Sequence, residues 1–136
     1  MIESKNSYNC WGKSSLIDKY LNQLEAHLKR IDIFTDYSFS YKIDQDAGTL
    51  KIWINATFQG GSRFDGFEFI VFAKDSLQKD KYRYNFIVND RIVRWDNAPH
   101  HSDIKTFPHH LHIDSRVVES QEPTLEYALR YIKKFL

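Results

Sequence analysis

The sequence contains little cysteine, proline or glycine. Its 136 residues include one cysteine, three prolines and five glycines. The lone Cys10 cannot form an internal disulfide, and the low content of proline and glycine argues against a disordered or collagen-like chain. A disulfide-stabilised secreted protein is therefore not indicated, and a reducing cytosol is the expected compartment.

Long apolar runs and an excess of charge of one sign are also missing. No stretch approaches the roughly 20 apolar residues that cross a bilayer, and residues 1–20 lack the apolar centre of a signal peptide. With 19 basic and 18 acidic residues, the net charge is +1. Total charge therefore does not indicate nucleic-acid binding, although a local basic patch would be hidden in this sum.

Apolar residues, by contrast, are abundant. Hydrophobic residues make up 42% of the chain, which contains 10 Phe, 8 Tyr and 3 Trp. At this length they are sufficient for one hydrophobic core and not for two. We therefore expect a single domain over residues 1–136, in which the polar segment 1–14 forms a flexible arm.

Hydrophobic periodicity predicts an α+β fold. Helical spacing of apolar residues predicts amphipathic helices at 15–30 and from Thr124 to the C-terminus. Between them, alternating or continuous apolar patterns predict five strands, of which the third is apolar on both faces and is therefore expected in the middle of the sheet. We expect an antiparallel meander of about five strands with both helices on one face. The predicted strands cover 37–44, 50–58, 64–72, 82–88 and 91–96.

Residues 97–116 show neither the helical spacing nor the strand-like alternation of apolar residues. Pro99 and Pro108 would interrupt a regular ladder, so this segment is expected to be an ordered loop or a short edge strand.

The dipeptide Asn89-Asp90 predicts a tight hairpin, because both residues tolerate positive φ. Counting outward from this turn pairs Asn85 with Arg94 and Arg83 with Asp96. These four side chains then share one face of the sheet, while their apolar neighbours face the helices. Considered alone, such a face is a solvated surface with a weak cross-strand ion pair.

Five of the six histidines follow this hairpin within 13 residues: His100, His101, His109, His110 and His112. Histidine exchanges a proton near neutral pH, and its neutral ring binds transition metals. Because the last predicted strand ends at Asp96, the histidine-rich segment begins at the edge of the polar face. We therefore expect the imidazole rings to converge with the polar side chains of the hairpin.

Three interpretations of this cluster remain open. In the first, two or three of the histidines bind zinc, manganese or iron together with Asp96 or Asp103. In the second, no metal is needed: one histidine accepts a proton from the 2′-hydroxyl of RNA, another donates one to the leaving oxygen, and Arg83 or Arg94 stabilises the charge on phosphorus. Exposed aromatic side chains would stack on bases. In the third, the segment is held by hydrogen bonds and stacking and presents a surface to a protein partner.

Three motifs in the C-terminal half resemble those of the TumE-like toxins, a family of small prokaryotic proteins. They are Tyr82-Arg83-Tyr84, the segment 94–101 (Arg-Trp-Asp-Asn-Ala-Pro-His-His) and the block 107–112 (Phe-Pro-His-His-Leu-His). The resemblance covers 82–136 well and the N-terminal half only in general layout. It implies the toxin of a toxin–antitoxin pair, whose partner is a cognate antitoxin, usually of the helix-turn-helix type.

The resemblance also marks eight motif residues in this chain: Arg83, Asp96, Asn97, His100, His101, His109, His110 and His112. One position departs from the family pattern. Asn85 stands where histidine is expected, and an amide forms hydrogen bonds but does not supply a proton at neutral pH. The activity of this chain can therefore differ from that of the family or be lost.

Together these observations predict a cytoplasmic, toxin-like protein that acts on RNA, in the preferred interpretation as an endoribonuclease. The predicted catalytic residues are His100, His101, His109, His110, His112 and Asp96. The predicted substrate-binding residues are Arg83, Asn85, Arg94 and Asn97. This interpretation requires no cofactor, although a transition metal at the histidine cluster is possible, and the alternative is a noncatalytic protein-binding or metal-binding module.

Overall fold

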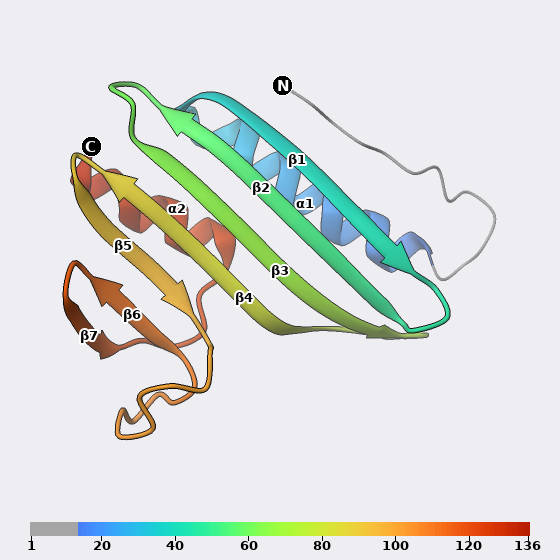
Figure 1. Cartoon of the computed structure of the whole chain (residues 1–136). Coiled ribbons are helices and arrows are strands. Elements are labelled where there is room, and N and C mark those ends of the chain that lie inside the picture. Colours follow the sequence, from blue (N-terminus) through green and yellow to red (C-terminus); the bar gives the residue numbers. More distant parts are fainter. Residues whose placement is uncertain (1–13) are drawn as a thin grey trace.

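The computed structural model describes residues 14–136, so the predicted arm before residue 14 lies outside the described residues. In chain order the elements are α1 (Ser14–Ile31), β1 (Phe34–Asp44), β2 (Thr49–Phe58), β3 (Arg63–Ala73), β4 (Ser76–Val88), β5 (Arg91–Asp96), β6 (His110–Ile113), β7 (Arg116–Glu119), α2 (Leu125–Ile132) and the 3₁₀ turn η1 (Lys133–Phe135). The strands form one antiparallel sheet in sequence order, and both helices lie on the same side of it (Figure 1).

The predicted α+β class, the meander order and the two terminal helices are confirmed. The sheet is larger than the five predicted strands. Strand β6 forms within the segment 97–116, which was expected to be an ordered loop or a short edge strand, and β7 begins at its last residue. Pro108 precedes β6 and so does not interrupt its ladder. The turn between β6 and β7 contains Asp114, with a φ of 54°, whose carboxylate accepts hydrogen bonds from the backbone of Ile92 and the side chain of Arg91. These bonds fix the new hairpin against β5.

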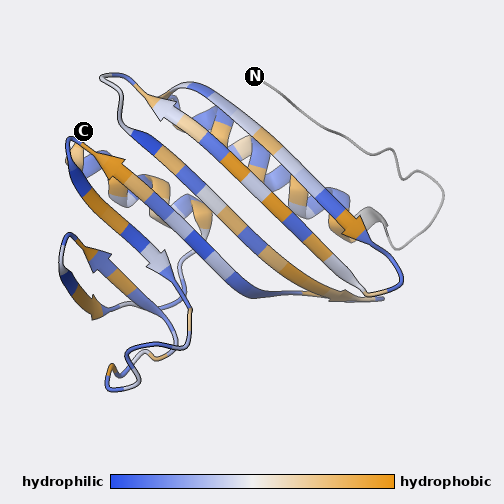
Figure 2. Cartoon of the chain, viewed as in Figure 1, coloured by the Kyte–Doolittle hydropathy of each residue, from blue (hydrophilic) through white to orange (hydrophobic). Residues whose placement is uncertain are grey.

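The hydrophobic core lies between the sheet and the two helices. Side chains of β2 alternate between buried and exposed along the strand, a pattern visible as alternating bands in Figure 2. On β5, Trp95 is 1% exposed and its ring makes an edge contact with Tyr131 of α2. Burying large apolar side chains stabilises the fold by about 1.5–3 kcal/mol each. None of the helices in the described part of the chain is long and apolar enough to span a membrane.

The carboxylate of Glu68 is buried within this core. Glu68 of β3 is 1% exposed and accepts hydrogen bonds from the hydroxyls of Tyr20 on α1 and Tyr84 on β4. Burial, and then the charge of Glu68, raises the pKa of both phenols, so both remain protonated donors. Lys79 donates to the Tyr84 hydroxyl at 2.8 Å and to the carbonyl of Pro123 at 2.7 Å. This network therefore joins α1, the sheet and the segment before α2.

Replacing Glu68 with alanine removes the acceptor of two buried hydroxyls. We expect Glu68→Ala to lower the free energy of unfolding by about 2–4 kcal/mol, because an unsatisfied buried donor costs about 1–3 kcal/mol. Glu119→Ala, at an exposed carboxylate of β7, is the matched control and is expected to change stability by less than about 0.5 kcal/mol. Urea unfolding monitored by fluorescence measures both variants. Equal effects of the two substitutions would contradict the role assigned to Glu68.

Candidate functional site

Paired strands gather the polar residues on the open face, which we define as the face of the sheet opposite α1 and α2. The predicted register of β4 and β5 is confirmed: Arg83 lies opposite Asp96, and Asn85 lies opposite Arg94. Strand β6 extends these rows, because His110 pairs with Asp96 and His112 pairs with Arg94. Directly opposite residues of antiparallel strands project to the same face. Residues 9 to 18 positions apart in the sequence are thereby brought side by side.

The carboxylate of Asp96 contacts groups from both β5 and β6. Its Oδ1 lies 2.9 Å from Nε2 of His110 and accepts a hydrogen bond from the backbone N–H of Ala98 at 3.1 Å. Its Oδ2 accepts a hydrogen bond from Nε of Arg94 at 3.1 Å, and Nε2 of His112 lies 3.7 Å away. Asp96 is itself buried. These contacts compensate the cost of removing its charge from water.

His110 is the most buried of the clustered histidines. Its side chain is 2% exposed, and both ring nitrogens face oxygen atoms. Nδ1 donates to the carbonyl of Pro108 at 2.9 Å, while Nε2 faces Asp96. The ring is therefore fixed on both sides. Any proton transfer or metal binding by His110 requires the loss of one of these contacts.

His112 is held as a neutral ring. Nη2 of Arg94 lies 3.2 Å from Nε2 of His112, and because a guanidinium can only donate, Nε2 is the acceptor. Burial, and then the positive charge of Arg94, lowers the pKa of His112 below its usual value of 6.5, although Asp96 acts in the opposite direction. At neutral pH this ring is a base that carries its hydrogen on Nδ1.

His101 reaches the cluster from the segment between β5 and β6. Its φ is 60°, a left-handed conformation that histidine adopts more readily than most residues. Its ring centroid lies 5.2 Å from that of His110 and 5.7 Å from that of His112. The exposed ring of His101 has no hydrogen-bond partner among residues 14–136. Within the described part of the chain, its ring nitrogens are therefore available to a bound molecule.

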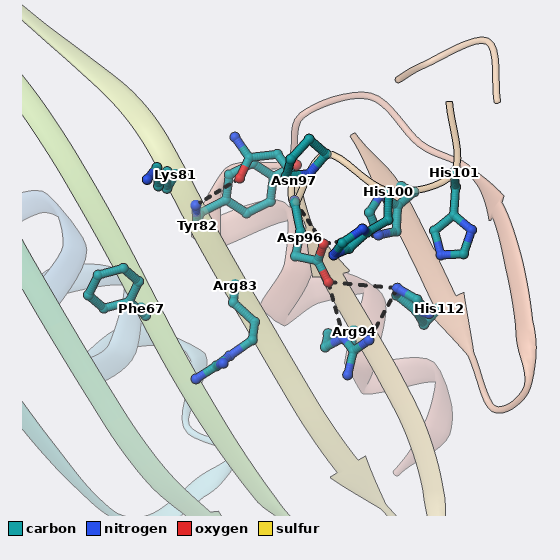
Figure 3. A pocket seen from close by; sticks show the side chains of 13 residues that line it. Phe67, Lys81, Tyr82, Arg83, Arg94, Asp96, Asn97, His100, His101 and His112 are labelled. Carbon is teal, nitrogen blue, oxygen red and sulfur yellow. Dashed lines mark hydrogen bonds and ion pairs between the residues drawn. The ribbon is translucent and has the colours of Figure 1, made fainter. Parts of the chain in front are cut away.

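These side chains line an open pocket of about 560 Å³. Figure 3 shows Asp96 and Arg94 beside the ring of His112, with Arg83 on the neighbouring strand and His101 farther along the pocket. Arg83 is exposed and forms no ion pair within the described range. Its guanidinium is therefore available to a bound anion such as a phosphate. His100 also lines the pocket, next to His101.

His109 lies outside this pocket. His109 is the residue before β6, and its ring packs on the helix side of the sheet rather than on the face that carries His110. Its ring stacks on that of Tyr82 at a centroid distance of 5.8 Å, and Nδ1 lies 2.9 Å from the Tyr82 hydroxyl. Nε2 lies 3.8 Å from a carboxylate oxygen of Glu122. These contacts join β6 to β4 and to the segment that precedes α2.

Neither asparagine among the predicted substrate-binding residues offers a free side chain to the pocket. Asn85 lies beside Arg94 in the register but does not line the pocket. Asn97 does line it, yet both ends of its amide bind the backbone of β4. Oδ1 accepts from the N–H of Tyr82 at 3.1 Å, and Nδ2 donates to the carbonyl of Asp80 at 2.9 Å, where the β3–β4 register shifts. Asn97 thus anchors the segment that carries His100 and His101.

Phe67 and Lys81 also line the pocket, and the sequence did not single them out. A signal for Phe67 was present in the double-sided apolar pattern of the third predicted strand. That pattern indicated a central strand. It also means that some apolar side chains of this strand, Phe67 among them, lie on the open face.

The cluster also has the composition of a metal-ligand set. One ring nitrogen from each of His101, His110 and His112 lies within 4.8 Å of the others, a spacing that permits a shared transition-metal ion. Such an ion would displace Asp96 or the Pro108 carbonyl from His110. Asp103, the other predicted oxygen ligand, does not line the pocket.

Comparison with protein-family models gives a match over residues 21–136 to the model described as Toxin TumE. The chain belongs to the TumE toxin family. The match includes residues 21–81, where the sequence motifs indicated only a similar layout. Membership of the TumE family implies a toxin–antitoxin context. No curated protein and no solved structure matches the chain.

Seven of the eight residues marked by the sequence resemblance line the pocket, and His109 is the exception. The seven are Arg83, Asp96, Asn97, His100, His101, His110 and His112. Motif residues from β4, β5, β6 and the intervening segment thus converge on one place in the fold.

Removing the charge of Arg94 tests the electrostatics of the pocket. We expect Arg94→Gln to raise the pKa of His112, because glutamine removes the cation that opposes protonation while it retains a hydrogen-bond donor. NMR titration of the imidazole signals measures this pKa. Arg91→Gln, which removes a cation that pairs with Asp114, is the control and should leave the pKa of His112 unchanged.

The same shift predicts a pH dependence of stability. The folded-state pKa of His112 lies below its unfolded value, so this ring contributes stability above the unfolded pKa, and the contribution is lost as pH falls through the folded pKa. Arg94→Gln should reduce this dependence. An unchanged or lower pKa of His112 in Arg94→Gln would show that Arg94 does not hold the ring neutral.

Proposed function

We propose that this chain is the toxin of a toxin–antitoxin pair and acts in the cytoplasm as an endoribonuclease. One observation carries the proposal: a neutral imidazole, a second imidazole with no hydrogen-bond partner among residues 14–136 and two guanidinium groups converge on one open pocket. RNA fits this set because its own 2′-hydroxyl provides the nucleophile. The protein then has to supply only proton transfer, positioning and positive charge.

His112 is the proposed general base. Its lowered pKa keeps the ring neutral, and Nε2 becomes available when Arg94 turns from the ring to a bound phosphate. Nε2 then accepts the proton of the 2′-hydroxyl while the 2′-oxygen forms a bond to the adjacent phosphorus. The bond between that phosphorus and the 5′-oxygen breaks, and His101 donates a proton to the leaving oxygen. Each such proton transfer typically accelerates a reaction by about 10²–10⁴-fold.

Two arginines stabilise the negative charge that builds up on phosphorus. Arg83 is exposed and without an ion pair in the described range, so it is the proposed first contact of the phosphate. Arg94 is oriented by Asp96, with 3.1 Å between its Nε and Oδ2 of the carboxylate. Once Arg94 has turned to the bound phosphate, a guanidinium oriented in this way stabilises the transition state without further reorganisation.

Asp96 and His110 are proposed as positioning residues. Both are buried, and their mutual contact together with the Pro108 carbonyl sets the place of β6 beside β5. His100 lines the mouth of the pocket and is a further contact for the substrate. His109 is proposed to act only through packing, since its contacts lie with Tyr82 and Glu122. The cognate antitoxin is the proposed protein partner.

Substitution of His101 is the most direct test of catalysis, because its ring is exposed and forms no hydrogen bond within the described residues. We expect His101→Asn to slow RNA cleavage by about 10²–10⁴-fold. Asparagine tolerates the left-handed backbone at this position, so the free energy of unfolding should change by less than about 0.5 kcal/mol. The rate is measured with purified protein, a labelled RNA and EDTA in the buffer.

His109→Gln serves as the matched histidine control. It removes a ring outside the pocket and should keep most of the cleavage rate, even where it lowers stability. Cleavage that disappears in EDTA and returns with a transition metal would refute the metal-free mechanism. Growth arrest by the wild-type chain with intact cellular RNA would refute cleavage and support the noncatalytic protein-binding alternative.

A further inference from the structure

A row of paired residues runs from the pocket across the open face. The register places Trp53 of β2 opposite Phe67 of β3, and Phe67 opposite Arg83 of β4. Arg83 in turn lies opposite Asp96. Since neighbouring strands lie about 4.8 Å apart, Trp53 is three strands, or about 14 Å, from Asp96. The row therefore joins two aromatic rings directly to the candidate active site.

The aromatic rings of this row are accessible. Trp53 is 38% exposed, and its ring lies 5.9 Å from that of Phe67, which itself lines the pocket. Phe69 follows on the same face of β3. Both helices lie on the opposite side of the sheet (Figure 1), so these rings do not pack in the hydrophobic core between the sheet and the helices. Single exposed apolar residues are common on proteins, but neighbouring rings beside a pocket indicate a binding surface.

Positive charge borders the aromatic rings on one side. In the next row of the register, Phe69 lies between Lys51 of β2 and Lys81 of β4, with Nζ of Lys81 5.9 Å from the Phe69 ring centroid. Lys51 and Lys81 are exposed and form no ion pair with a residue of the described range, as is also true of Arg83. Asp65 lies on the other flank, two residues before Phe67. The side that carries the lysines is therefore complementary to a polyanion.

We propose that this surface is a binding path for single-stranded RNA that leads into the pocket. The path consists of Trp53, Phe67, Phe69, Lys51, Lys81 and Arg83. Aromatic rings on an open sheet stack on unpaired bases, and lysine and arginine contact the phosphates between them. The inference rests on the proposed function, for which it names the class of substrate.

The geometry favours a single strand over a duplex. The bases of a duplex are stacked and paired, so their faces cannot reach Trp53 and Phe67. Arg83 lies between Phe67 and Asp96 in the register. A phosphate bound to Arg83 therefore places one neighbouring base on Phe67 and directs the next phosphodiester toward the histidines. Two bases occupy the rings of Trp53 and Phe67 in this arrangement.

Binding is tested without cleavage by a fluorescein-labelled oligouridine whose riboses are 2′-O-methylated, because the blocked 2′-oxygen cannot attack. Fluorescence anisotropy with the full chain measures Kd. We expect Trp53→Ala to weaken binding by about 5- to 100-fold, the loss of one stacked base. Tyr127→Ala is the matched control, since Tyr127 is an exposed aromatic of α2 on the opposite side of the sheet. It should leave Kd unchanged.

A second variant tests the charges. Lys51→Gln with Lys81→Gln should weaken binding and reduce its dependence on salt, because fewer counterions are released. Circular dichroism confirms that each variant is folded. A duplex of the same length should bind more weakly than the single strand.

The outcomes separate this inference from the nuclease proposal. Equal binding by the wild type, Trp53→Ala and the lysine variant would overturn the RNA path, even where the pocket cleaves RNA. The expected losses of binding, with unmodified RNA left intact, would support the path and refute the nuclease. Absence of RNA binding, with binding of an acidic antitoxin that Trp53→Ala weakens, would assign the surface to a protein partner and overturn the path.

Discussion

The contact between Asp96 and His110 holds β5 and β6 together at the place where the pocket forms. Both side chains are buried, and the same carboxylate also binds the backbone of Ala98 and the guanidinium of Arg94. Loss of either partner would leave a buried polar group unsatisfied. The position of His112 on β6 and the direction of the segment that carries His101 both follow from this contact.

The two faces of the sheet differ in how their polar groups are satisfied. On the helix side, Glu68 is satisfied by tyrosine hydroxyls, and His109 packs on Tyr82. On the open face, Arg83 and His101 have no such partners within the described residues, so their polar groups are available to a ligand. The histidine-rich motif is thus divided between the two faces, with His109 on the helix side and the histidines of β6 on the open face.

Local patterns in the sequence were sufficient to predict part of this site. The turn at Asn89-Asp90 fixes the register of its hairpin, and the structure pairs Arg83 with Asp96 as that register requires. The pairing of β5 with β6 could not be derived in this way, because β6 is four residues long and a 13-residue segment separates it from β5. Without that pairing, neither the burial of His110 nor the exclusion of His109 from the pocket was predictable. The binding of β4 by Asn97 depends on a shift of register that no local pattern indicates.

The central claim is that His112 and His101 move protons for an RNA that attacks its own backbone. Analysis of the new ends of RNA cleaved by the purified chain tests this claim most directly. Attack by the 2′-oxygen must leave a 2′,3′-cyclic phosphate on one fragment and a free 5′-hydroxyl on the other, and these are the expected ends. Fragments with 3′-hydroxyl and 5′-phosphate ends would show that water is the nucleophile and would contradict the claim.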